Sequence, residues 1–163
     1  FDEKIKTASV EDYLFSHKLR KYKKFVSDKL IVKHDFPSFQ KTIKVYFDRS
    51  KEWTNILLKK KTKFNAGGGT SKKNAFSSIL SFLILIECFF LKFSPISLYS
   101  LVVTLFIFLY LNFELFKLSF RKEGLIFSIF FIIYHLFLNI IVFTGAVLGF
   151  LSYFLEKTKL IHQ

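Results

Sequence analysis

The sequence predicts an α/β part at its N-terminal end, followed by α-helical transmembrane segments. Two observations predict this division. Residues 1–74 contain 19 Lys and Arg against 8 Asp and Glu, whereas residues 75–163 contain 6 against 4. Three long apolar runs follow one another in the second part, and short strand-like stretches alternate with helical patterns in the first. A basic, water-facing segment therefore precedes a lipid-compatible one.

The first elements are a helix and two short strands. Residues 9–23 are predicted to be helical because Ser9 can cap the segment and apolar residues recur at helical spacing. Those residues are Phe15, Leu19 and Tyr22. The strand-like stretches 25–26 and 30–32 follow, and they supply the β part of the prediction.

A long amphipathic helix is predicted over residues 39–57, after Pro37 and Ser38. Large residues recur there at i, i+4 and i+7, and lysines occupy the other face. The recurring positions are Phe39, Ile43, Tyr46, Ser50, Trp53 and Leu57. Residues 65–74 combine three successive glycines with lysines, which predicts a flexible, basic linker.

The apolar part is long enough for several membrane helices. Spanning segments must satisfy their own backbone polar groups, which requires helices. We expect them at about 75–93, 96–116 and 125–150, with a turn at 92–95, a basic connection at 117–124 and a polar tail at 156–163. A buried hairpin of a large soluble protein is the alternative reading.

The distribution of Lys and Arg predicts the orientation. Cytoplasmic segments carry an excess of these residues. Residues 1–74 are then cytoplasmic, the turn at 92–95 lies outside, and the connection at 117–124 returns to the inside. The expected location is the cell membrane, crossed more than once.

Four polar residues interrupt the apolar runs or lie close to them: Glu87, Glu114, His135 and Asn139. Ionisable groups within a membrane are functional candidates. His135 and Asn139 share one helix face, which favours a hydrogen bond between helices. Contact with the headgroup of a lipid-linked acceptor is the alternative.

The first chemical candidate is the acidic pair Glu11 and Asp12, beside a cluster of basic residues. A carboxylate held there can accept a proton from an attacking hydroxyl group. The pattern Ser9-x-x-Asp12 is equally typical of a helix capping box, in which the acids favour the helix N-terminus. Spacing alone favours the capping role.

The order of motifs resembles that of the family 2 glycosyltransferases. The run Glu11-Asp12 followed by Leu19-Arg20-Lys21 resembles the acceptor-site motif of that family, and Val32-Lys33-His34 stands where the family has Val-x-His. The segment with Arg49 and Trp53 comes next. The tail, with Arg121-Lys122-Glu123-Gly124, His135, Gly145 and Gly149, is also similar to many members. The resemblance implies that residues 1–64 are the C-terminal part of a GT-A-like catalytic domain.

The resemblance also implies a reaction and its residues. The family transfers a sugar, with inversion, from a nucleotide-diphosphate donor. Asp12 corresponds to the general base and Glu11 shapes the acceptor pocket, while Arg49 and Trp53 line the acceptor side. His34 corresponds to a residue near the metal–diphosphate region; a His that is simply packed or hydrogen-bonded at the end of a strand is the alternative, and the more common one. The Gln-x-x-Arg-Trp motif of processive members is missing, since Arg49 and Trp53 are four residues apart. Transfer of a single sugar is therefore expected.

The resemblance further implies a divalent cation, Mg²⁺ or Mn²⁺, whose ligands lie mostly outside this chain. The donor-binding half of the family is not in the sequence, which we interpret as a C-terminal fragment that is inactive alone. The expected acceptor is lipid-linked or part of an envelope glycan. The lysine clusters at 18–24 and 59–63 favour anionic headgroups over nucleic acid, since each basic residue near such a surface gains about 1 kcal/mol. The alternative function is a non-enzymatic basic membrane protein that docks a partner or anionic lipid.

Overall fold

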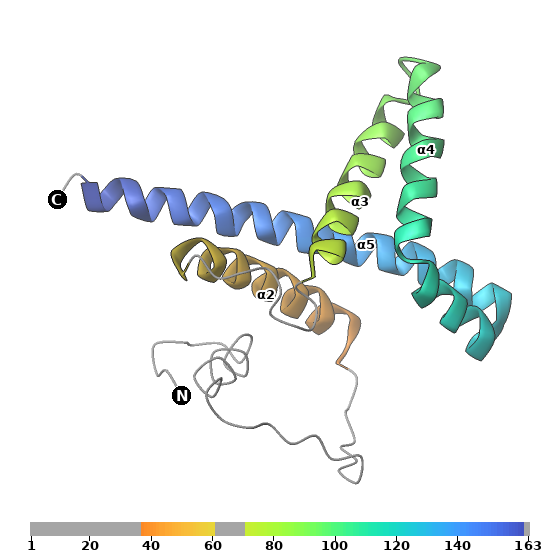
Figure 1. Ribbon diagram of the computed structural model, residues 1–163, viewed down its shortest axis with the longest axis horizontal. Helices are drawn as coiled ribbons and strands as arrows, with labels where there is room; N and C mark the ends of the chain where they lie inside the picture. The colour runs from red at the N-terminus through yellow and green to blue at the C-terminus, as the bar shows by residue number, and fades with distance from the viewer. Residues whose placement is uncertain (1–36, 61–70, 162–163) are drawn as a thin grey trace, which may run out of the picture.

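The computed structural model describes residues 37–60 and 71–161, and this part of the chain is almost entirely helical. Figure 1 shows one very long helix, a second helix lying along it, and a helical hairpin that stands away from both. In chain order the helices are α2 (Phe39–Lys60), α3 (Lys72–Phe90), α4 (Ile96–Leu111) and α5 (Phe113–Ile161).

The predicted α/β fold class is wrong for the residues that the structure describes. They are 92% helical, contain no strand, and form an all-α arrangement. The prediction depended on apolar runs of two and three residues, which are too short to distinguish a strand from other structure. The amphipathic pattern over 39–57 lies within α2, and α2 packs on helix α5. The strand-like stretches 25–26 and 30–32 lie outside the described residues.

Helices α3 and α4 form an antiparallel hairpin with polar contacts near both ends. Near the open end, the Asn112 side chain donates a 2.8 Å hydrogen bond to Ser77 Oγ. Close to the turn, Thr104 donates a 3.1 Å bond to Glu87. Between these contacts lie Leu80, Ile84 and Phe108 of a buried apolar cluster that Phe116 of α5 completes. The buried Ser81 hydroxyl in the same space donates to the backbone oxygen of Ser77 in its own helix. The polar pairs fix the register of the hairpin, because a slip along the helix axis would separate both.

Helix α5 is two helices joined at Gly124, where the backbone adopts φ 84° and ψ −177°. The chain reverses there, so residues 113–123 run back along the helix that follows (Figure 1). Ser119 and Ser128 lie 3.1 Å apart across the reversal, and the rings of Phe116 and Phe131 lie 6.2 Å apart one turn further on. The expected basic connection at 117–124 is thus mostly helix. The expected span 96–116 is interrupted at Asn112, where α4 ends.

Helix α2 lies against the C-terminal half of α5 and runs parallel to it (Figure 1). Gly145 and Gly149 allow this close approach. A Cβ added at Gly145 would lie 2.5 Å from the carbonyl oxygen of Phe47, and one at Gly149 would overlap the carbonyl oxygen of Lys51. Small residues spaced four apart let helix backbones approach closely in membrane proteins. The two glycines therefore form the surface of α5 that the backbone of α2 contacts.

Two stretches are long and apolar enough to cross a membrane, Lys72–Phe90 and Phe113–Thr158, and the second of them reverses at Gly124. Helix α4 is also apolar but has 16 residues. Large apolar side chains are exposed along these helices, with Phe106 70% and Ile126 75% accessible. Exposed apolar surface of this extent marks contact with lipid or protein. Length and composition thus support association with a membrane.

Candidate functional site

Only part of the predicted catalytic site falls within the described residues. Glu11, Asp12 and His34 lie outside them. Arg49 and Trp53 lie one turn apart on α2, where Arg49 is exposed and Trp53 is half-buried. The structure therefore places the two predicted acceptor-side residues on one helix, next to the apolar helix α5.

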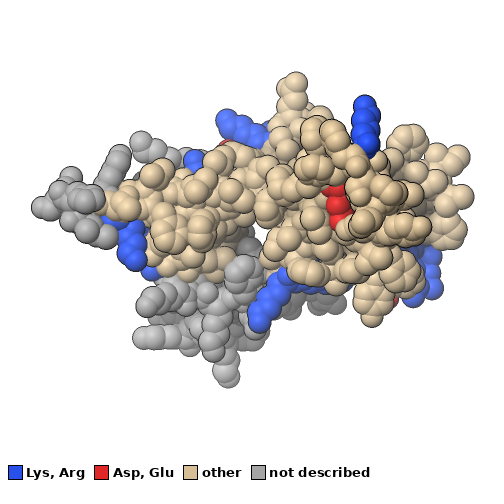
Figure 2. All heavy atoms as spheres, turned by 90° about the horizontal axis from the view of Figure 1, so that it is seen from above, with Lys and Arg blue, Asp and Glu red and all other residues tan. Residues whose placement is uncertain are grey.

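Helix α2 carries five exposed cations, which are Lys41, Lys44, Arg49, Lys51 and Lys59. Lys59 forms a 2.5 Å ion pair with Glu156 at the C-terminal end of the contact with α5. On the hairpin side of the molecule, basic side chains project from the outline and acidic atoms occupy only a small area (Figure 2). The exposed cations of α2 suit an anionic partner.

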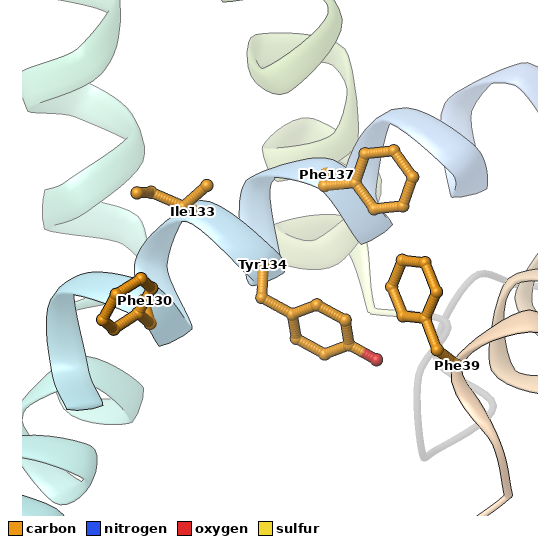
Figure 3. Close-up of a pocket in the computed structure, with 5 residues that line it drawn as sticks. All are labelled: Phe39, Phe130, Ile133, Tyr134 and Phe137. Carbon is orange, nitrogen blue, oxygen red and sulfur yellow. The ribbon is translucent and has the colours of Figure 1, made fainter.

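An open apolar groove lies where the N-terminal end of α2 meets α5. It has a volume of about 310 Å³ and is lined by Phe39, Phe130, Ile133, Tyr134 and Phe137. Phe39 reaches over from α2, and the other four residues come from α5 (Figure 3). The Phe39 ring stacks on Phe137 with 6.0 Å between ring centroids and lies at the same distance from Tyr134.

The groove is suited to a hydrocarbon chain. Its walls are almost entirely carbon, and the Tyr134 hydroxyl lies at the end near Phe39 (Figure 3). Phe130 and Ile133 are 69% and 62% exposed, so an extended chain can enter from the side. Each CH₂ group that leaves water for such a surface gains about 0.8 kcal/mol. Exposed lysines of α2 lie within six residues of Phe39, where an anionic headgroup on that chain can meet them.

A polar junction connects the hairpin to α5. The Asn112 amide nitrogen bonds Ser77 Oγ, and its oxygen lies 3.2 Å from Nε2 of His135. The His135 ring is surrounded by Phe108, Phe116 and Phe131 with centroid distances of 5.7 to 6.0 Å. Asn139, one turn later, donates 2.8 Å to the backbone oxygen of His135. His135 thus has the helix–helix hydrogen bond that the sequence favours.

The divalent cation that the resemblance implies finds no ligand set in residues 37–60 and 71–161. No group of three or more His, Cys, Asp and Glu residues there can hold a metal ion. His34, which the resemblance places near the metal–diphosphate region, lies outside the described residues.

Sequence reasoning missed the groove, although the sequence contains a signal for it. Phe130, Tyr134 and Phe137 recur at i, i+4 and i+7, which places them on one face of α5. In an apolar run this stripe is indistinguishable from a lipid-facing surface. What makes it a groove is Phe39, which lies 91 residues earlier in the chain than Phe130.

Comparisons with known proteins add no relative. No family model, no curated protein and no solved structure matches the chain. The resemblance to family 2 glycosyltransferases therefore stays a prediction from motif order.

Proposed function

We propose that the chain functions in a membrane-bound inverting glycosyltransferase, which moves one sugar from a nucleotide-diphosphate donor to a lipid-linked or envelope-glycan acceptor. The observation that carries this proposal is the apolar groove beside the basic helix α2. Groove and lysines together suit a molecule with a hydrocarbon chain and an anionic headgroup. The motif order from Glu11 to Gly149 supports sugar transfer as the reaction.

In the proposed reaction Asp12 is the general base. It takes the proton of the acceptor hydroxyl while that oxygen attacks the anomeric carbon of the sugar, and the nucleotide diphosphate leaves from the opposite face. Glu11 shapes the acceptor pocket beside it. Arg49 and Trp53 on α2 line the acceptor side, because α2 extends from the groove toward them.

The proposed location is the cell membrane, with residues 1–74 on the cytoplasmic side. The support is the charge asymmetry, since 19 of the 25 Lys and Arg residues precede residue 75. Nucleotide-linked sugars are made in the cytoplasm, so the donor reaches this side directly.

The test uses the natural full-length protein in membranes. Radiolabelled UDP-linked and GDP-linked hexoses are supplied, and label is measured in the lipid and glycan fractions. Asp12→Asn is compared with the unmodified protein, and Asp28→Asn serves as the matched control because it makes the same change outside the acidic pair. We expect a loss of about 100-fold or more in Asp12→Asn, the usual contribution of a general base, and none in the control.

A second function is favoured by the exposed cations of α2, namely a non-enzymatic membrane protein that docks anionic lipid. The same experiment separates the two. If no sugar is transferred by the unmodified protein with either donor class, while α2 still binds vesicles containing phosphatidylglycerol, the second function replaces the first. Equal transfer by Asp12→Asn and the unmodified protein removes Asp12 from the mechanism.

A further inference from the structure

The carboxyl group of Glu87 is buried between α3 and α4, with 7% of the residue exposed. Its Oε1 atom accepts hydrogen bonds from the hydroxyl groups of Ser100 and Thr104, the latter at 3.1 Å. Its Oε2 atom is also buried, and no described residue bonds to it. The second carboxyl oxygen thus lacks the partner that buried polar atoms normally have.

The neighbouring hydroxyl groups cannot supply that partner as they are arranged. A hydroxyl has one proton to donate. Thr104 lies 3.0 Å from the backbone oxygen of Ser100 as well as near Glu87, so two acceptors compete for its proton. Ser100 directs its proton to Oε1. Ser100 and Thr104 can still offer oxygen lone pairs to a cation beside the carboxyl group.

No protein cation neutralises Glu87 within the described part of the chain, where the ion pair observed is Lys59 with Glu156. The titratable residues closest to Glu87 on the hairpin are Cys88, Lys92 and Tyr99, and all three are exposed. His135, which α5 places against the hairpin, bonds Asn112 at the opposite end. A buried charge without a partner costs several kcal/mol, so an ionised Glu87 requires a cation from elsewhere.

We propose that Glu87, Ser100 and Thr104 form a binding site for one Na⁺ ion that bonds the free Oε2 atom. A single carboxylate provides one negative charge, which one monovalent cation cancels. Carboxylate and hydroxyl oxygens are the hard ligands that such ions take in proteins. Intramembrane carboxyl groups are typical of ion and proton sites. This site is independent of the proposed sugar transfer, because none of its residues lies on α2 or in the groove.

The position of the carboxyl group allows exchange with water. Glu87 lies three residues before the end of α3, which corresponds to about 4.5 Å along the helix axis. Ser100 is exposed next to it, and the turn that follows contains Lys92 and Ser94. A cation therefore has a short path from the hairpin turn to the site.

The test is modification of Glu87 by a hydrophobic carbodiimide in the full-length protein, purified in detergent. The reagent reacts with a protonated carboxyl group: the carboxyl oxygen bonds the carbodiimide carbon, its proton passes to nitrogen, and the adduct rearranges to a stable N-acylurea. Peptide mass spectrometry locates the adduct. Rates are measured from pH 5 to pH 9, in NaCl and in choline chloride of equal concentration. Glu87→Gln removes the reactive group, and Glu114→Gln, which changes an exposed glutamate in the same way, is the matched control.

We expect Glu87 to be modified and the rate to fall when Na⁺ holds the site. Na⁺ at about ten times its dissociation constant leaves roughly one site in eleven free, so the rate falls about tenfold relative to choline. A fall with rising pH that Na⁺ leaves unchanged overturns the proposal, because any carboxyl group reacts with the reagent in this way. Modification that is absent throughout overturns it as well.

A second measurement does not depend on the reagent. If Na⁺ binds the folded state, NaCl raises the midpoint of thermal unfolding above that in choline chloride, and Glu87→Gln abolishes this difference. Equal responses of the two proteins to NaCl contradict the site.

Discussion

The side-chain oxygen of Asn112 lies 3.2 Å from Nε2 of His135, and the amide nitrogen of the same asparagine bonds Ser77. One residue between α4 and α5 thus connects both to α3. Because Asn112 is 6% exposed, each of these bonds replaces one to water or to another polar group.

Replacing Asn112 with leucine should therefore destabilise the protein. Interhelical hydrogen bonds in membrane proteins contribute about 0.6 kcal/mol each on average, so two lost bonds predict a decrease of about 1 kcal/mol. Thermal unfolding in detergent measures the effect. Asn139→Leu, which removes a bond within one helix, is the control and should cost less. A variant as stable as the unmodified protein would show that the junction contributes nothing.

The reversal at Gly124 predicts a strong preference for glycine. Its φ of 84° with an extended ψ belongs to a region that is essentially restricted to glycine. No atom lies within 4 Å of an added Cβ, so the cost of Gly124→Ala is conformational and not steric. We expect a loss of about 1–3 kcal/mol in unfolding free energy. Leu125→Ala, beside the turn, is the control. Disulfide trapping of Ser119→Cys with Ser128→Cys should become less efficient in the Gly124→Ala background.

The close contact of α2 with Gly145 and Gly149 predicts that methyl groups added at these glycines destabilise the protein. Gly145→Ala and Gly149→Ala each push a Cβ against α2 backbone, and overpacking of this kind costs about 1–3 kcal/mol. Zero-length crosslinking of Lys59 to Glu156 reports whether α2 remains docked, and we expect its yield to fall in both variants. Val147→Ile adds a methyl group to an exposed position of the same helix and should leave the yield unchanged. Unchanged yields in the glycine variants would mean that α2 tolerates displacement.

If the groove holds the hydrocarbon chain of the acceptor, a substitution that fills it should weaken acceptor binding without slowing the chemical step. Ile133→Trp places a large ring in the groove, so we expect a higher KM for the lipid acceptor, by about tenfold, with little change in kcat. Ile129→Trp makes the same change on an exposed part of α5 outside the groove lining and is the matched control. Kinetics with increasing acceptor lipid distinguish the two variants. An equal effect in both would argue against occupation of the groove.

The sequence predicts where helices form better than where they turn. The spacing from Phe39 to Leu57 predicts a helix, and α2 spans Phe39–Lys60. The apolar runs predict lipid-compatible helices, but apolar composition does not locate a reversal of the chain. The break at Asn112 and the turn at Gly124 depend on hydrogen bonds and dihedral angles that side-chain hydrophobicity does not encode. The strand-like stretches 25–26 and 30–32 lie outside the described residues and stay predictions, and a few β-branched residues are in any case compatible with many structures.

The candidate site shows the same limit. The i, i+4 spacing of His135 and Asn139 can be recognised from the sequence. The hydrogen-bond partner of His135, Asn112, is 23 residues away and cannot be recognised in this way. Phe39 and Phe137 stack across an even longer separation. Periodicity identifies the face of a helix on which a residue lies. It does not identify the element that covers this face, which is decided by packing of the whole chain.

The pairing of α2 with Gly145 and Gly149 has a consequence for biogenesis. During synthesis, α2 leaves the ribosome about 90 residues before the surface that receives it. Contacts between segments so distant in sequence close late, because the intervening chain must first be ordered. The hairpin of α3 and α4 can form from segments that are neighbours in the sequence. Helix α2 can pack only after the C-terminal half of α5 has been made. Helix α2, although it is the first helix of the described chain, is thus among the last to reach its native position. Truncation after residue 144 would remove Gly145 and Gly149, the surface on which it packs.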